Sequence, residues 1–306
     1  MHFTLKQLKY IEATGRLGSI ANAATELHIS QSSITAAIGA FERQIGYDLF
    51  VRTPAKGISV TPAGADAIRL IRAFIIQGRH FEAEVMSVGG DATGSVRISC
   101  YATAAPSFLP PILQNFKSTY PDASIKLLEG NMEATISYLT NGEADLAFTY
   151  DEMVGNGHEF TPLFKAAPYA LMAADDPLAN GTSVSMAELA ERPMVLLDLP
   201  RTKDYFIGMF DQLGLKPTLA HSTRSAEIAR ALVSGGYGYS ILNICPPDYR
   251  RDDTRFRTLP ISDDLRAPVF GIITMSGMRQ PKIVEAFVQQ CVSLAQAGAF
   301  DDITVH

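Results

Sequence analysis

The sequence predicts an α/β fold in three parts: a group of short N-terminal helices with two strands, one long helix, and a two-lobed α/β domain. Apolar residues follow a helical period near the N-terminus and a seven-residue period after residue 62, and strand-like and helical segments alternate from Ser95 onward. With 306 residues, 47% of them apolar, the chain is long enough for two or three domains with buried cores.

Residues 19–45 predict two helices that meet at a tight turn. Apolar residues at i, i+3, i+4 and i+7 are Ile20, Ala23, Ala24 and Leu27 in the first helix and Ile34, Ala37, Ile38 and Phe41 in the second. His28 and Ile29 form the break, and Ser30 is placed to cap the second helix. The pattern favours a helix-turn-helix over a helical hairpin inside a larger core. The second helix would offer a short run of residues to the DNA major groove, namely Ser30, Gln31, Ser32, Ser33, Thr35 and Ala36.

Two short strands are expected next, around a turn at Pro54 to Gly57, and together they would form a wing. Thr61 then caps a new helix that has Pro62 in its first turn. The net charge is −6 overall but about +2 over residues 1–90, with nine Lys/Arg against seven Asp/Glu. Phosphate contacts are therefore expected from a few placed cations, Arg43, Arg52 and Lys56, although Arg43 could instead pair with a carboxylate.

Residues 3 to 64 closely resemble the winged helix-turn-helix of LysR-type transcriptional regulators. The residues that carry this resemblance are Leu5, Leu8, Ser19, Ala23-Ala24, Leu27, Ser30-Gln31, Ile34, Phe41-Glu42, Leu49-Phe50-Val51-Arg52 and Thr61-Pro62-Ala63-Gly64. Two positions depart from the family pattern. Ser32 stands where the family usually has Pro, and Ala36 stands where many members have a long polar residue, which removes one base contact.

The helix from Pro62 to about Val88 carries a heptad pattern, formed by Ala67, Ile71, Phe74, Gly78, Phe81, Val85 and Val88. A second copy of the same helix could cover this apolar stripe, and the alternative is packing on the chain's own C-terminal domain. In the family that the chain resembles, this element is the linker helix that pairs two subunits antiparallel.

From Ser95 the alternation of segments implies a parallel sheet with helices on its faces. The expected strands are 95–101, 124–129, 144–150, 168–174, 194–197, 218–221, 239–242, 255–259 and 269–274. The expected helices are 107–120, 132–140, 185–189, 205–213, 226–234 and 282–296.

The C-terminal part also resembles the LysR-type effector domain, a relative of periplasmic binding proteins of type II. The matching segments are Leu109–Leu113, Phe116, Tyr120-Pro121, Leu127, Glu129-Gly130, Leu139, Gly142–Ala147, Asp176–Ala179 and Gly235–Tyr239. The resemblance implies a DNA-binding domain at 1–61, a linker and dimerisation helix at 62–90, and an effector-binding domain at 91–306. Lobe I would comprise 91–165 and 268–306, and lobe II would comprise 166–267.

An effector would bind beyond the carboxyl ends of the strands, beside helix N-termini that favour an anion. The expected effector-binding residues are Tyr101, Thr103, Asn131, Thr149, Pro200, Arg201, Thr202, Tyr205 and Asn243. This set suits a small organic acid, an aromatic one included, with Arg201 holding its carboxylate. Alternatively, Arg201 forms a salt bridge to Asp198 or Asp204, and Tyr205 belongs to the core.

Other classes of protein lack support in the sequence. Phosphate-binding, zinc-protease and hydrolase-elbow motifs are absent, and the six His residues have no metal-ligand spacing, so neither an enzyme nor a cofactor is expected. Cys100, Cys245 and Cys291 are too scattered for a disulfide framework, and a redox switch is disfavoured. No 18-residue apolar run and no signal peptide are present, so we expect a cytoplasmic bacterial protein.

The sequence thus predicts a LysR-type regulator that binds double-stranded operator DNA and responds to a small-molecule effector. We expect a homodimer through the linker helix, assembled into a tetramer, with RNA polymerase as a further partner if the protein is an activator. An architectural DNA-binding protein without a ligand is the second alternative, but a two-lobed domain would have no use in it. A stand-alone solute-binding protein conflicts with the helix-turn-helix.

Overall fold

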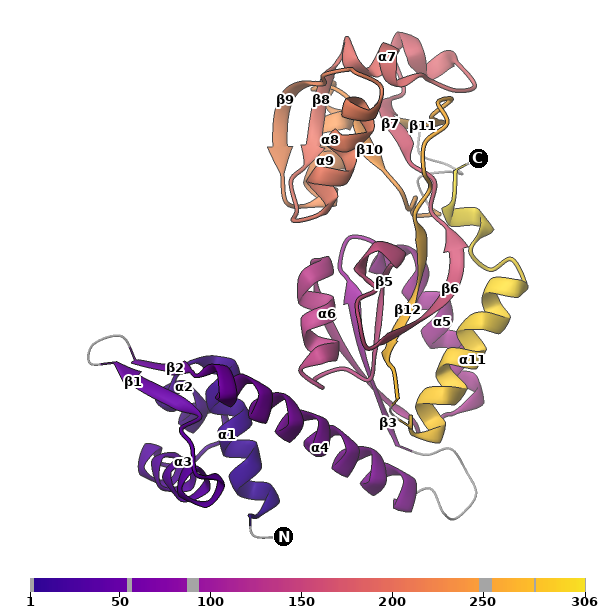
Figure 1. The fold of residues 1–306 in the computed structure, drawn as a ribbon. Coiled ribbons are helices and arrows are strands. Elements are labelled where there is room, and N and C mark those ends of the chain that lie inside the picture. The colour runs from indigo at the N-terminus through magenta and orange to yellow at the C-terminus, as the bar shows by residue number, and fades with distance from the viewer. Residues whose placement is uncertain (1–2, 54–56, 87–93, 248–254, 278, 306) are drawn as a thin grey trace. The chain divides into compact units, whose positions relative to one another are not determined.

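The computed structural model describes residues 3–53, 57–86, 94–247, 255–277 and 279–305 (Figure 1). The chain divides into two compact units: Met1–Gly89 with Met278–Pro281, and Gly90–Gly277 with Lys282–His306. The elements of the first unit are α1 (Leu5–Leu17), α2 (Ile20–Glu26), α3 (Gln31–Ile45), β1 (Phe50–Thr53), β2 (Gly57–Val60) and α4 (Pro62–Met86).

The predicted helix-turn-helix is confirmed as α2 and α3. Ile34 and Ile38 of α3 are fully buried, together with the small residue Ala23 of α2, so the two helices share one core with α1. The Ser30 hydroxyl accepts the N–H of Ser33 at 3.2 Å, which is the predicted N-cap. The break before it is set by His28, which takes a positive φ of 53°.

The two predicted strands pair antiparallel, with Phe50 opposite Val60. Thr61 fixes the junction to α4, because its hydroxyl donates to the Asp48 carbonyl at 2.8 Å and accepts the Gly64 N–H at 2.8 Å. A Cβ on Gly64 would fall far inside van der Waals distance of the Leu49 carbonyl. Glycine at this position therefore lets the start of α4 pack directly against the chain that leads into β1.

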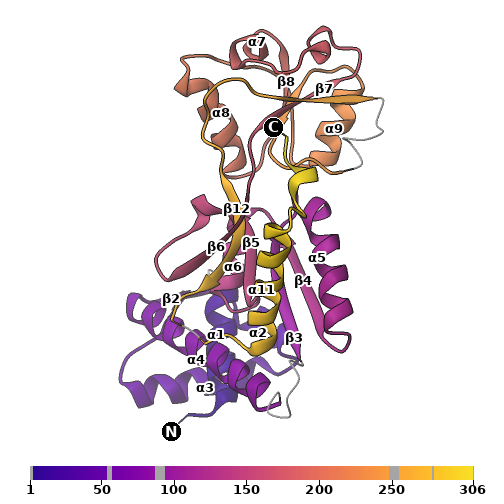
Figure 2. The same ribbon diagram turned by 90° about the vertical axis from the view of Figure 1, so that its right-hand side faces the viewer.

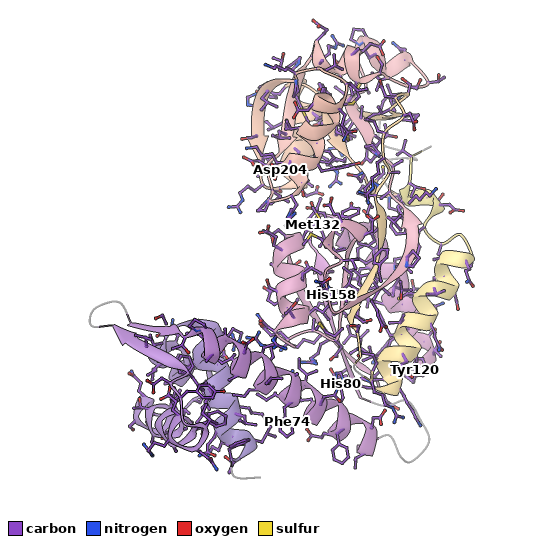
Figure 3. The ribbon with its side chains drawn as sticks, in the orientation of Figure 1. Phe74, His80, Tyr120, Met132, His158 and Asp204 are labelled. Atoms are coloured by element: carbon purple, nitrogen blue, oxygen red, sulfur yellow. The ribbon has the colours of Figure 1, made fainter. Side chains whose placement is uncertain are left out.

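Helix α4 has two different halves. Ala67 and Ile71 of the heptad pattern are buried in the core of the first unit. Further along, Phe74, which is labelled in Figure 3, is 42% exposed, Phe81 is 71% exposed, and Val85 is exposed as well. Val88 lies outside the described residues. The second half of the stripe is thus not covered by the first unit itself.

The second unit contains two lobes joined by crossing strands. Lobe I consists of β3 (Ser95–Tyr101), α5 (Ala105–Thr119), β4 (Ser124–Gly130), α6 (Met132–Thr140), β5 (Leu146–Tyr150), η1 (Asp151–Met153), β6 (His158–Lys165), β12 (Val269–Met275), α11 (Lys282–Gln296) and η3 (Asp301–Ile303). Lobe II consists of β7 (Tyr169–Ala173), η2 (Pro177–Asn180), α7 (Met186–Ala190), β8 (Pro193–Leu197), α8 (Thr202–Gln212), β9 (Thr218–Thr223), α9 (Ala226–Ser234), β10 (Ser240–Leu242) and β11 (Phe256–Pro260).

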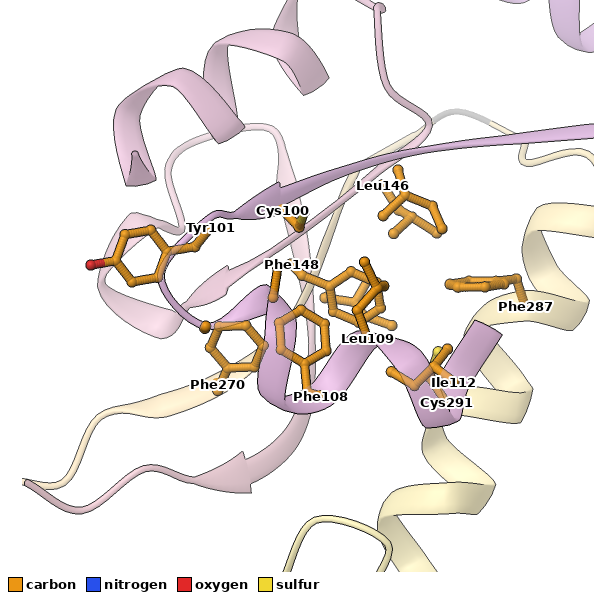
Figure 4. Packing of buried hydrophobic residues seen from close by; sticks show 14 of the residues in the cluster. Cys100, Tyr101, Phe108, Leu109, Ile112, Leu146, Phe148, Phe270, Phe287 and Cys291 are labelled. Carbon is orange, nitrogen blue, oxygen red and sulfur yellow. The ribbon is translucent and has the colours of Figure 1, made fainter. Parts of the chain in front are cut away.

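Lobe I is a five-stranded sheet with strand order β4-β3-β5-β12-β6. Helix α6 packs on one face, while α5 and α11 lie together on the other (Figure 2). On that second face the rings of Phe108, Phe148 and Phe270 pack closely, with the Phe108 centroid 4.9 Å from Phe148 and 4.8 Å from Phe270 (Figure 4). This aromatic core packs beside the carboxyl ends of β3 and β5, where the candidate site begins.

Lobe II contains a three-stranded antiparallel sheet in the order β10-β7-β11 and a parallel pair of β8 and β9. A bridge between Met194 and Tyr239 links the two sets of strands. Large side chains such as Phe206 and Phe210 of α8 are buried against them.

The predicted parallel sheet is present only in part, because antiparallel strands join it. Strands β3, β4 and β5 are parallel, as are β8 and β9, but β12 runs antiparallel to both β5 and β6. Strand β6 is absent from the predicted elements. It is an edge strand, its Pro162 cannot donate a ladder hydrogen bond, and the register shifts beside it at Phe270/Gly271.

The chain passes between the lobes where β6 leads into β7 and where β11 leads back to β12. These two passages lie side by side, because Val269 is the register partner of Lys165 and the Ala166 N–H donates to the Pro268 carbonyl at 2.9 Å. The lobes are therefore joined along this strip of paired backbone, and also where the Cys245 N–H of lobe II donates to the Ile303 carbonyl of lobe I at 2.9 Å.

Candidate functional site

The first candidate surface is the exposed face of α3. Gln31, Ser32 and Ser33 are exposed in its first turn, as is Ala36 one turn later, and Thr35 is partly buried. The Ser30 hydroxyl lies 2.9 Å from that of Ser32 and 2.8 Å from that of Ser33. Ser30 is thus engaged as the cap, and Gln31 is the longest polar side chain that this turn offers.

The predicted phosphate contacts are described only in part. Arg43 is exposed near the end of α3 and, among the described residues, has no carboxylate within salt-bridge distance. Lys56 lies outside the described residues, and of Arg52 only the backbone in β1 is described.

The second candidate site is a cavity between the two lobes of the second unit. Its walls come from the ends of β3 and β5, the starts of α5, α6 and α8, and the end of β10. Empty space within them amounts to about 480 Å³ including the open mouth, but water centres can occupy only about 30 Å³. Since one water needs about 10–15 Å³ of such space, the cavity in this state holds about two waters.

A hydrogen bond between the lobes crosses this cavity. The Tyr101 hydroxyl of lobe I lies 3.0 Å from the Thr202 hydroxyl of lobe II, and both residues are buried. Burial raises the pKa of Tyr101, although hydrogen bonds to Thr103 and Thr202 oppose the rise. Tyr101 therefore stays neutral near pH 7 and can both donate and accept a proton in a hydrogen bond.

Asn243 connects the cavity to the strip between the lobes. Its side-chain amide donates to the Ala166 carbonyl at 2.8 Å and lies 3.4 Å from the Tyr205 hydroxyl. Tyr205 in turn reaches the Arg266 carbonyl at 3.4 Å, and burial raises its pKa to about 12. Both residues line the cavity. A ligand that moved Asn243 or Tyr205 would also change contacts where the chain passes between the lobes.

Five of the nine predicted effector residues thus line one cavity, namely Tyr101, Thr103, Thr202, Tyr205 and Asn243. The other four do not line it. Thr149 is fully buried in β5, and its neighbour Tyr150 lines the cavity instead, because successive strand residues face opposite sides of the sheet. Asn131 caps α6 by accepting the Ala134 N–H at 2.8 Å, and Pro200 is exposed.

Arg201 does not line the cavity, and its salt-bridge partner is neither Asp198 nor Asp204. Its guanidinium is 3.5 Å from the Glu133 carboxylate of α6, so the ion pair spans the two lobes. Asp198 pairs with Lys203 at 3.6 Å instead, which corrects the expected alternatives for Arg201. Arg201 also has a positive φ of 68°, an unusual conformation for a residue with a side chain.

Several cavity residues were not among the predicted ones. They are Ala104, Met132, Tyr150, Glu152, Leu197, Phe206, Leu242, Ile244 and Pro268. Met132 begins α6. Glu152 follows β5 in a short 3-10 turn that no motif marks. Leu197 and Leu242 could have been inferred from their positions at strand ends.

Other kinds of site find no support in the described parts of the chain. Over these residues, no three His, Cys, Asp or Glu side chains are grouped so that they could hold a metal ion. Cys100, Cys245 and Cys291 are buried, and burial raises the pKa of Cys100 to about 11 and that of Cys291 to about 12. Such thiols are poor nucleophiles, which opposes a redox switch.

A search of the described helices for one that is both long and apolar enough to cross a membrane finds no candidate.

Comparison with known proteins identifies both units. The family model for the LysR substrate binding domain matches residues 89–296, and that for the bacterial regulatory helix-turn-helix protein of the lysR family matches residues 5–65. A solved LysR family protein from Pseudomonas aeruginosa is 31% identical, with 97% of this chain and 99% of that one covered and a TM-score of 0.62.

Two further relatives are also transcriptional regulators. The regulator HinK from Pseudomonas aeruginosa is 30% identical over 96% of this chain and 99% of its own, with a TM-score of 0.60. The RuBisCO operon transcriptional regulator of Allochromatium vinosum is 28% identical, with 85% of this chain and 86% of that protein covered. The two-lobed unit is periplasmic-binding-protein-like. The chain therefore belongs to the LysR family of DNA-binding transcriptional regulators, with a substrate-binding domain after its helix-turn-helix.

Proposed function

We propose that this regulator changes its DNA binding or its activation of transcription in response to a small organic acid, aromatic acids included, that occupies the inter-lobe cavity. The observation that carries the proposal is the cavity itself, which has hydroxyl and amide groups from both lobes in an otherwise apolar lining. Such a mixture is typical of sites for small organic ligands.

The state described here is a closed one for any ligand larger than two waters. Two contacts between the lobes support it, the hydrogen bond between Tyr101 and Thr202 and the ion pair between Arg201 and Glu133. A ligand that replaces these contacts binds the opened arrangement more tightly than the closed one, and it shifts the population between them. The change in the lobes then alters how paired helix-turn-helix units sit on bent DNA.

In this scheme the first unit reads the operator through α3, with phosphate contacts from Arg43, Arg52 and Lys56. Residues 1–61 bind DNA, 62–90 pair subunits, and 91–306 bind the effector in lobes at 91–165 with 268–306 and at 166–267. The exposed apolar residues on the second half of α4 support a homodimer through this helix. We expect a tetramer in the bacterial cytoplasm, with contact to RNA polymerase if the protein activates.

Replacing Gln31 and Thr35 together by Ala should abolish sequence preference, because these residues are placed to contact base edges one helical turn apart. Each lost base contact costs about 1–3 kcal/mol of discrimination. Binding to operator and to scrambled DNA by fluorescence anisotropy measures the preference. Asn22→Ala in α2 is the control, since its side chain is exposed outside α3. Intact discrimination by the double variant would contradict the placement of the recognition helix.

Phe74→Asp with Phe81→Asp should reduce the size of the assembly, because two unpaired carboxylates would enter the helix pairing. Sedimentation velocity should show a smaller species, and footprints on paired half-sites should weaken. Leu213→Asp is a matched control, since Leu213 is 43% exposed on lobe II and lies outside α4. An unchanged oligomer would show that this stripe is not the pairing surface.

Arg201→Ala should weaken binding of an acidic effector about tenfold, the lower end for a hydrogen bond to a charged group, because the Arg201 side chain is 59% exposed. Its affinity for DNA without effector should hardly change. Calorimetry with a panel of small carboxylic acids measures the loss, and Lys203→Ala controls for a general loss of positive charge. Equal affinity for wild type and the Arg201 variant would assign this residue to the ion pair alone.

A further inference from the structure

The cavity wall carries a negative charge, whereas an acidic ligand alone would need a positive one. Among the described residues that line the cavity, Glu152 is the one with a formal charge, and it is negative. The nearest predicted cation, Arg201, is absent from the lining and pairs with Glu133. Glu152 is exposed, so it lies where the cavity opens to solvent, and a carboxylate ligand beside it would face a carboxylate of the protein.

The two cations that act on Glu152, Arg201 and Arg266, are each paired with another carboxylate. Asp151 is paired with Arg266 at 2.9 Å and also accepts the Val269 N–H at 3.2 Å. Arg201 is paired with Glu133. Within the described chain, the Glu152 side chain accepts no hydrogen bond and forms no salt bridge. Burial and then Asp151 raise its pKa, while Arg201 and Arg266 act in the opposite direction without cancelling the rise.

Aromatic rings line the same cavity. Tyr101, Tyr150 and Tyr205 contribute to it, with the Tyr101 and Tyr150 ring centroids 5.9 Å apart in an edge arrangement. The faces of tyrosine rings attract cations, and more strongly where water is excluded. One carboxylate without a salt bridge among the described residues and three tyrosines in an apolar lining together favour a positively charged nitrogen over a second anion.

We propose that the occupant of the inter-lobe cavity is a small zwitterion with an apolar body, whose ammonium group binds Glu152 among the tyrosine rings and whose carboxylate faces Arg201. The inference rests on the proposed function, because it takes this cavity as the effector site. It makes Glu152 a residue that determines specificity, and it narrows the ligand from organic acids in general to those that also carry an amine.

Calorimetry on the full-length protein can test this with probes that share one body and differ only in their charged groups. Phenylalanine, 3-phenylpropanoate and 2-phenylethylamine form one such set, and leucine, 4-methylpentanoate and 3-methylbutylamine form a second. In at least one set the amino acid should bind at least tenfold more tightly than the acid. Glu152→Gln should weaken binding of that amino acid about tenfold to a hundredfold and should not weaken binding of the acid.

Glu159→Gln is the matched control, because Glu159 is an exposed carboxylate of lobe I on β6 that does not line the cavity. An unchanged melting temperature for both variants shows that folding is intact. Acids that bind as tightly as their amino acids, or a Glu152→Gln variant with unchanged affinity, would overturn the inference while leaving the proposed function in place. If no probe of either set binds, the inference fails, and failure of a wider panel of acids as well would contradict the effector site itself.

Discussion

The effector-binding unit depends on the paired passages of the chain between its lobes. Strand β12 completes the sheet of lobe I only after the chain has built lobe II, so neither lobe is a continuous segment. The hydrogen bond from Ala166 to Pro268 holds the outgoing and returning strands together. This strip, together with the hydrogen bond between Cys245 and Ile303, therefore constrains relative motion of the lobes, and Asn243 connects the strip to the cavity through the Ala166 carbonyl. Occupancy of the cavity and the position of the lobes are linked by direct contacts.

Much of the fold follows from local sequence. The bounds of β3, α6, α9 and α11 coincide with the predicted segments, because each has a clear period and an identifiable start. The caps at Ser30 and Thr61 were predictable because side-chain oxygens satisfy free N–H groups at those helix starts. Strand direction was not predictable for β12, since its partners β5 and β6 are set by the return of the chain from lobe II. Edge strand β6 was hidden by Pro162.

The candidate site, like the fold, could be predicted from the sequence only in part. Residues at the ends of β3 and β10 and at the start of α8 could be placed in one cleft from topology alone, and Tyr101, Thr202 and Asn243 do line it. Thr149 could not be distinguished from Tyr150, because one step along a strand reverses the face. The partner of Arg201 was also hidden, since Glu133 comes from the other lobe and nearer carboxylates lie in the sequence. Glu152 carries no motif, and its importance comes from the absence of a cation in the described cavity wall.

The central claim is that an effector enters this cavity only when the lobes move apart, since the closed state has room for about two waters. Spin labels at Ser137→Cys on α6 and Asp211→Cys on α8 would report the separation, because both positions are exposed and the three native cysteines are buried. Electron paramagnetic resonance should give a distance distribution that shifts on addition of the tightest-binding carboxylic or amino acid found by calorimetry. A saturating ligand that leaves the distribution unchanged would contradict the account.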